Sequence, residues 1–203
     1  MKNYVLLFLG GLALTSCVKH EVIPAPTPPV PTVTYDCSFI GEVDGTSKSL
    51  IAGQNGFYCN ENKVIATVTQ QPTTGIWFSE ILHPSSAEKA KLSHGQMSWP
   101  ETDNLPSTLD WRTFYLNNPS PLIADDAVGG VEFSYTDNTG TEFTTQDTSV
   151  YNSTINYTFL EADSASNGLF IKYTATINCK VYSEAGASKI ISGATMKGAY
   201  KYN

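Results

Sequence analysis

The sequence predicts an all-β fold, an antiparallel β-sandwich of immunoglobulin-like or jelly-roll-like type, with at most one short helix. Apolar and polar residues alternate in many short segments, as they do in strands that bury one face. Turn signals built on Gly, Asn, Asp and Pro separate these segments at close spacing, which is typical of sandwiches and barrels. The composition agrees, because only 15% of the 203 residues are charged while Ser, Thr, Asn, Gly and Tyr are abundant, as in many extracellular all-β domains.

The N-terminus has the pattern of a secretory signal peptide. Lys2 supplies a positive start, an apolar run extends from Tyr4 to Leu14, and small residues follow. The sequence LTSC, which ends at Cys17, resembles the lipobox of bacterial lipoproteins, in which the cysteine thiol is diacylated and the peptide is cleaved before it. We therefore predict a lipoprotein signal peptide over residues 1–16 and lipidation of Cys17. An ordinary secreted protein with an incidental cysteine is the alternative.

Lipid chains on Cys17 would anchor the protein to the membrane, because the apolar run is shorter than the about 20 residues that a spanning helix needs. Residues 17–34 are predicted to form a proline-rich tether. Five prolines lie between Pro24 and Pro31, and proline disfavours both a regular helix and a central strand. We predict that residues 35–203 form a single β-sandwich domain, a length that suits one hydrophobic core.

The first half of this domain reads as strands and turns, including a hairpin turn at Asp44-Gly45. A short helix is predicted near 86–93, because Ser85 or Ser86 can cap it and Glu88 would lie in its first turn. Four prolines argue against long regular elements in residues 95–127. The strands predicted before the helix cover residues 37–43, 48–52, 55–59, 63–70 and 73–82.

The C-terminal part alternates more clearly. A hairpin is predicted around Asn138-Thr139-Gly140, between apolar segments at 128–137 and 141–145. Further strands are predicted at 154–160 and 169–182, where apolar and polar residues alternate, and at 188–200, which returns after the turn Glu184-Ala185-Gly186.

Three segments of this part carry a family resemblance: Tyr135 to Gly140, Asn178 to Tyr182 (NCKVY), and Ile191 to Gly198. They resemble the turn and the last two strands of small uncharacterised β-sandwich lipoproteins of the Bacteroidota, and the likeness covers mainly residues 131–202. The resemblance implies an envelope-anchored domain in the outer membrane, with the cell surface favoured over the periplasmic face. Neighbouring families are often called adhesin-like, but a shared fold does not transfer function.

The same resemblance draws attention to Asp163-Ser164-Ala165, in a predicted loop. Bacteria of this group O-glycosylate exported proteins at Asp followed by Ser or Thr and a small or apolar residue. Ser164 is therefore a candidate O-glycosylation site. A solvated loop serine is the alternative.

Three cysteines remain once Cys17 is lipidated: Cys37, Cys59 and Cys179. Export permits disulfides, and three thiols allow one intramolecular bridge. The candidate bridges that join distant parts of the chain are Cys37–Cys179 and Cys59–Cys179. Three reduced, buried cysteines are the alternative.

Charge and motifs exclude several functions. The net charge is −7 and Arg112 is the single arginine, which argues against nucleic-acid binding. The histidines lack the His-Glu-x-x-His spacing of zinc enzymes, and Gly-x-Ser-x-Gly is absent. We therefore predict no enzymatic activity, no cofactor and no metal site. The loop at Asp125-Asp126 is the better of the weak calcium candidates, and ordinary solvation explains it equally.

A set of aromatic residues in the middle segment supplies the candidate binding residues Trp99, Trp111 and Tyr115. Sugars stack on such rings, and protein interfaces also favour them. The alternative is that the rings fill the core. Two functional hypotheses follow: a non-catalytic accessory subunit that binds an outer-membrane protein partner, or a surface glycan-binding or adhesin-like module. Exposure of the tryptophans on a concave face would favour the second, and burial would favour the first.

Overall fold

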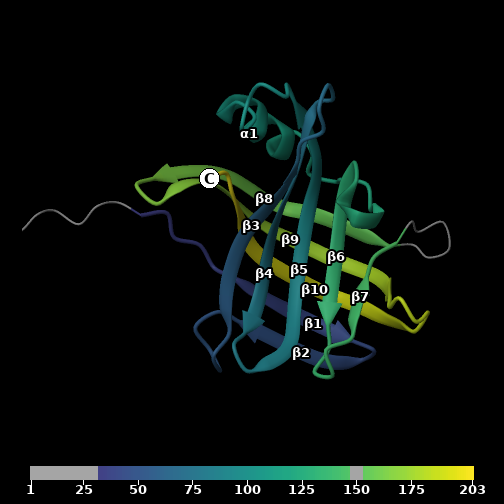
Figure 1. The fold of residues 1–203 in the computed structure, drawn as a ribbon. Coiled ribbons are helices and arrows are strands. Elements are labelled where there is room, and N and C mark those ends of the chain that lie inside the picture. The colour runs from purple at the N-terminus through teal and green to yellow at the C-terminus, as the bar shows by residue number, and fades with distance from the viewer. Residues whose placement is uncertain (1–31, 147–152) are drawn as a thin grey trace, which may run out of the picture. The chain divides into compact units, whose positions relative to one another are not determined.

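In the described part of the chain, ten antiparallel strands form one continuous sheet that curls on itself, and one short α-helix packs against its inner face near one end of the strands (Figure 1). The computed structural model describes residues 32–146 and 153–203, which belong to one compact unit. The predicted signal peptide (1–16), the lipidation site Cys17 and most of the tether lie outside the described residues. No helix in the described ranges is long and apolar enough to cross a bilayer.

The strands follow the sheet in the order β2-β1-β10-β9-β7-β6-β5-β4-β3, and β8 pairs with β9 beside this path. The predicted all-β antiparallel class is confirmed, although its two layers are halves of one sheet. Thr144 of β7 pairs with Tyr182 of β9, which joins the halves. The strands are β1 (Ser38–Val43), β2 (Thr46–Ile51), β3 (Tyr58–Ala66), β4 (Thr73–His83), β5 (Ser86–Trp99), β6 (Gly130–Thr136), β7 (Glu142–Thr144), β8 (Thr154–Ala165), β9 (Gly168–Tyr182) and β10 (Ser188–Lys201).

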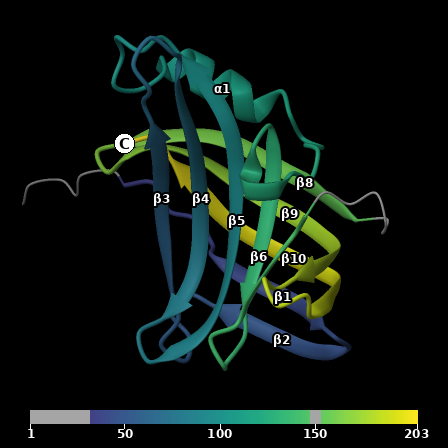
Figure 2. The same ribbon diagram turned by 45° about the vertical axis from the view of Figure 1, so that its right-hand side comes forward.

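The alternation of the sequence explains the curl. Every second residue of β4 and β9 is buried, so each strand turns one apolar row toward the concave side. Rings from opposite halves meet there: Phe39 of β1 stacks on Phe133 of β6, with 5.5 Å between ring centroids. Figure 2 shows β3, β4 and β5 standing across β10, β1 and β2, so that the sheet encloses its own core.

The helix predicted near 86–93 is wrong, because these residues begin strand β5. Ala90 and Leu92 are fully buried whereas Lys89 and Lys91 are only partly buried, which is the period of a strand. Alanine, glutamate and lysine favour helices on their own, and here burial on the sheet overrides that preference. The helix of this fold lies later, at α1 (Thr108–Leu116), between two of the prolines.

Helix α1 begins at a conventional cap. The Ser107 hydroxyl accepts a hydrogen bond from the Asp110 backbone N–H at 3.1 Å and also donates to the Asp110 carboxylate at 2.7 Å. Trp111 and Tyr115 are four residues apart, so they share the face that packs into the concave side of the sheet.

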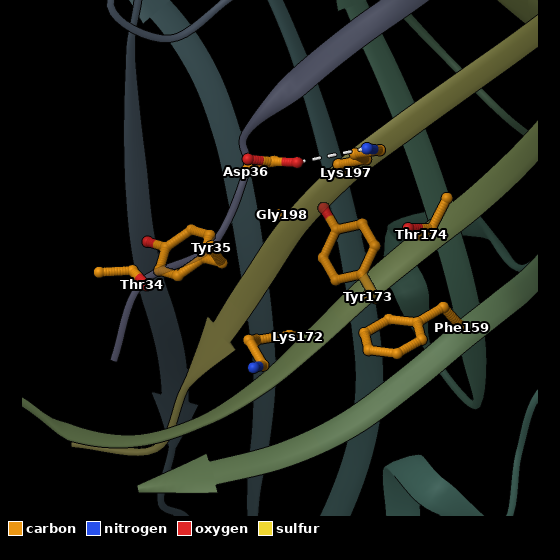
Figure 3. A pocket seen from close by; sticks show the side chains of 9 residues that line it. All are labelled: Thr34, Tyr35, Asp36, Phe159, Lys172, Tyr173, Thr174, Lys197 and Gly198. Atoms are coloured by element: carbon orange, nitrogen blue, oxygen red, sulfur yellow. Dashed lines mark hydrogen bonds and ion pairs between the residues drawn. The ribbon is translucent and has the colours of Figure 1, made fainter. Parts of the chain in front are cut away.

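The segment before β1 crosses the outer face of β10 and β9. The Asn167 side chain holds Val33 at both backbone atoms, accepting from its N–H at 2.7 Å and donating to its carbonyl at 3.0 Å. Next to it, Tyr35 packs on Phe170. Figure 3 shows the ion pair between Asp36 and Lys197. The chain therefore enters the sheet along a fixed path.

A disulfide joins this segment to the far end of the sheet. Cys37 and Cys59, at the start of β3, are bridged with their Cα atoms 6.1 Å apart, and Cys179 is free and buried. The bridges predicted to Cys179 are wrong. Cys179 pairs with Ile191 of β10, whereas Cys37 directly precedes a residue paired with Lys197, so the two sites lie about 20 Å apart along that strand.

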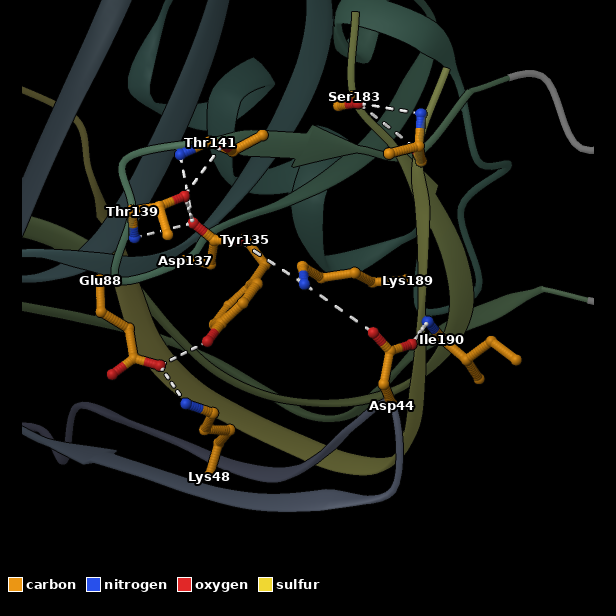
Figure 4. A network of polar contacts seen from close by, with 11 residues as sticks. Asp44, Lys48, Glu88, Tyr135, Asp137, Thr139, Thr141, Ser183, Lys189 and Ile190 are labelled. Atoms are coloured by element: carbon orange, nitrogen blue, oxygen red, sulfur yellow. Dashed lines mark hydrogen bonds and ion pairs between the residues drawn. The ribbon is translucent and has the colours of Figure 1, made fainter. Parts of the chain in front are cut away.

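Polar contacts brace the opposite end of the curl (Figure 4). Lys48 of β2 pairs with Glu88 of β5 at 2.7 Å, and the same carboxylate accepts the Tyr135 hydroxyl. Lys189 of β10 lies 3.8 Å from Asp44 and 3.6 Å from Asp137. These contacts connect the turn between β1 and β2 with strands of the other half, so both ends of the curl are closed.

The disulfide generates the first prediction. Replacing both Cys37 and Cys59 with serine should lower the free energy of unfolding by about 3 kcal/mol, as expected for a closed loop with a sequence separation of 22. Urea unfolding of wild type with and without reductant measures the same difference. Cys179→Ala is the control, because it should keep the full effect of reductant. A reductant effect that is lost in Cys179→Ala and kept in the double variant would contradict the Cys37–Cys59 pairing.

Candidate functional site

The three aromatic residues predicted to bind a ligand lie in the core. Trp111 and Tyr115 are fully buried, and Trp99 is 5% exposed. Trp77 of β4 receives both helix rings, at centroid distances of 6.1 Å to Trp111 and 6.5 Å to Tyr115. The prediction that these rings stack on sugars is therefore wrong. An aromatic pair spaced by four residues in a capped helix is the buried stripe of an amphipathic helix.

A buried histidine stands at the centre of this aromatic core. The Tyr157 hydroxyl lies 3.0 Å from His94 Nδ1 and 2.7 Å from the Tyr200 hydroxyl, while the Tyr115 hydroxyl donates to the His94 carbonyl at 3.2 Å. These contacts join β5, β8, β10 and α1. Burial lowers the pKa of His94 to about 3, so the imidazole is neutral at physiological pH.

The alternation within β5 could have predicted the burial of His94. His94 follows Ala90 and Leu92 at every second position, so it lies on the same buried face of the strand. His94 Nε2 has no hydrogen-bond partner among the described residues, and the side chain is fully buried. Because the imidazole of His94 has no solvent-exposed surface, a dissolved substrate cannot contact it in this structure. The network therefore serves to hold the two halves of the sheet and the helix together.

Three carboxylates gather where β6 begins. Ligand atoms of Asp125, Asp126 and Glu132 lie within 4.8 Å of one another, and these residues could hold a cation such as Ca²⁺. Burial raises the pKa of Glu132, which accepts the Asp126 backbone N–H and lies 4.0 Å from the Lys91 ammonium. Asp126 has a φ of 53°. These contacts explain the cluster without a cation, because Glu132 of β6 binds the backbone of the tight turn at Asp126.

Ser164 is exposed, as its predicted modification requires, but it lies at the end of strand β8 opposite Leu169 of β9. The predicted loop is thus the closing end of a hairpin. Its neighbour Asp163 accepts a hydrogen bond from Lys172 at 3.0 Å. O-glycosylation of Ser164 stays a prediction.

The feature that the sequence did not single out is strand β3, which forms one end of the sheet. Its pairing with β4 is continuous from Tyr58–Leu82 to Ala66–Thr74. The first half of β3 is covered, because Cys59 is bridged, Glu61 binds Tyr35, and the Lys63 ammonium donates to the Tyr202 carbonyl at 3.1 Å.

The second half of β3 is exposed and apolar. Val64 is 59% exposed, Ile65 follows it, and Val68 beyond the strand is 61% exposed. Val64 pairs with the half-buried Ile76 of β4, so the two side chains share the outer face. We call Val64, Ile65 and Ile76 the β3 edge patch. Edge strands of monomeric proteins are usually blunted by charge, proline or bulges. In β3 the charged residues Glu61 and Lys63 lie in the covered half, whereas residues 64–66 are all apolar.

Comparison with protein-family models, with curated proteins and with solved structures found no match to this chain.

The core position of Trp111 generates the second prediction. Trp111→Ala should lower the free energy of unfolding by about 3–5 kcal/mol, because it empties the space between the helix and the sheet. Leu109→Ala, on the exposed side of the same helix, should change it by about 0.5 kcal/mol or less. Chemical denaturation measures both. Equal and small effects would mean that α1 does not pack as described.

The burial of His94 generates the third prediction. At pH 5 the unfolded chain protonates this histidine, whose ordinary pKa is 6.5, whereas the folded protein, with its pKa near 3, does not. The contribution of neutral His94 to the free energy of unfolding is therefore fully present above pH 6.5 and is lost as the pH falls toward 3. Between pH 7.5 and pH 5 the loss should be about 2 kcal/mol.

Urea unfolding of wild type and His94→Gln at the two pH values isolates this term, because only wild type should show it. His83→Gln, at the last residue of β4, is the control and should show the same pH difference as wild type. A pH difference that is unchanged in His94→Gln would show that His94 is accessible to protons in the folded state.

Proposed function

We propose that this protein is a lipid-anchored, non-catalytic accessory subunit of an outer-membrane protein complex, and that it binds its partner by strand addition at β3. The observation that carries the proposal is the β3 edge patch, an apolar strand edge at the end of the sheet. The lipobox at Cys17 supports the location.

The chemistry of the edge defines the occupant. In an antiparallel strand, alternate residues direct their N–H and C=O groups away from the paired neighbour. The matching ligand is an extended peptide backbone, and apolar β-branched side chains on it would contact Val64 and Ile76 on the outer face. We therefore assign the patch to a β-strand of a partner protein, with a second copy of this chain as the competing occupant.

The aromatic core favours a protein partner over a glycan bound by the three aromatic residues. Trp99, Trp111 and Tyr115 are used in packing α1 against the sheet, so they are not available at the surface. An exposed apolar strand edge is the feature expected of a protein interface.

The fourth prediction tests the edge. Val64→Lys should abolish co-purification of a stoichiometric partner from native membranes, because a lysine on an edge strand prevents strand addition. The measurement is a detergent pull-down of the full chain quantified by mass spectrometry. Ile190→Lys, at an exposed apolar position of β10, is the matched control and should retain the partner.

Direct contact is checked with a photo-crosslinking amino acid at position 64, which should give one discrete adduct that maps to an extended segment of the partner. Adducts between two copies of this chain would assign the edge to self-association. A partner lost equally in both lysine variants, or retained in both, would contradict the β3 interface.

A further inference from the structure

A second surface feature is independent of the β3 edge patch. The outer face of β8, β9 and β10 carries a hollow of about 490 Å³, closed on one side by the segment that enters β1. Its size is within the range of small-ligand sites. Figure 3 shows Tyr35 and Phe159 on opposite sides of this hollow, with Tyr173 and Lys172 between them.

Phe159 reaches the hollow because β8 contains a bulge. Tyr157 points into the core, where it bonds His94, and strict alternation would direct residue 159 inward as well. The register between β8 and β9 shifts between Tyr157 and Phe159, so that Phe159 instead pairs with Thr174 on the outer face. Phe159 is 47% exposed. Bulges commonly redirect a side chain next to a binding site, and here the result is an exposed ring.

The opposite wall is held in place. The Tyr35 hydroxyl donates to Glu61 of β3, and its ring packs 5.8 Å from Phe170. The hydrogen bonds between Asn167 and Val33 fix the backbone just before it. A preformed aromatic wall lowers the ordering cost of binding.

The charged groups of the hollow are already paired. Lys197 lies 3.3 Å from Asp36, and Lys172 lies 2.8 Å from Glu161 and 3.0 Å from Asp163. Such pairs offer little net charge to an ion, but they present donors and acceptors together. The ligand that matches an aromatic surface flanked by donors and acceptors is a neutral molecule with hydroxyl groups and an apolar face.

A smaller hollow of about 280 Å³ adjoins the first and shares Tyr35, Asp36 and Lys197 with it. The Asp36–Lys197 pair therefore stands between two depressions on the outer face. Two adjoining depressions suit a chain of several rings better than a single ring.

We propose that this hollow binds a neutral oligosaccharide, with one sugar ring stacked on Phe159 and hydroxyl groups bound by the Asp36–Lys197 and Lys172 pairs. This function goes beyond partner binding and uses none of the residues of the β3 edge patch. The two proposals can therefore fail separately.

The fifth prediction is tested with the full chain in a detergent that contains no sugar. The probes are cellotetraose, maltotetraose, mannotetraose and tetra-N-acetylchitotetraose, with a heparin tetrasaccharide as the anionic probe, and binding is measured by titration calorimetry. At least one neutral probe should bind, and Phe159→Ala should weaken it by at least about tenfold. Lys197→Met should also weaken it.

Tyr58→Ala is the matched control, because Tyr58 is 45% exposed on β3 and lies outside the hollow. It should bind as wild type does. Three results would overturn the proposal: no neutral probe binds, only heparin binds, or Phe159→Ala and Tyr58→Ala bind as tightly as each other. Urea unfolding verifies that each variant is folded, and Val64→Lys should leave saccharide binding unchanged.

Discussion

The fold depends on filling the concave side of one curled sheet. A sheet that folds over itself must bury a wide inner face and provide hydrogen-bond partners for most of the polar groups placed there. The rings of Tyr115 and Tyr200 stack at 4.8 Å between centroids, and Tyr157 bonds both Tyr200 and His94. This cluster joins the helix to strands from both halves of the sheet. The disulfide at one end and the Lys48–Glu88 and Lys189 contacts at the other then close a shape that the core has already set.

The sequence predicted those elements whose alternation is undisturbed. The long strand at 169–182 was predicted nearly as observed, because its buried face repeats at every second residue over its whole length. The start of β5 was predicted as a helix because Ala, Glu and Lys favour that state locally. The pairing of Ala90 with Ile81 in the β4–β5 hairpin and with the distant Tyr135 of β6 makes these residues a strand.

The candidate sites were harder to predict than the strands, because they too depend on contacts between segments that are distant in the sequence. The disulfide partner of Cys37 depends on how far the sheet curls, and no local pattern encodes the return of Cys59 to its side. The exposure of Phe159 depends on a bulge, which reverses the face that simple alternation assigns. The tryptophans suggested a binding surface because sequence alone does not distinguish an aromatic stripe on a helix from an aromatic platform on a surface.

Because the interior is filled, the candidate binding surfaces lie on the outside of the sheet, and both are connected to the first half of β3. Tyr35 forms the wall of the outer hollow and also binds Glu61, three residues before Val64 on β3. The disulfide at Cys59 fixes the same strand to the segment that carries Tyr35. The covered first half of β3 is thus a rigid support shared by both surfaces. Among the described residues, the disulfide at Cys59 and the Tyr35–Glu61 hydrogen bond both hold β3 before Val64, and the exposed second half of the strand lies beyond them.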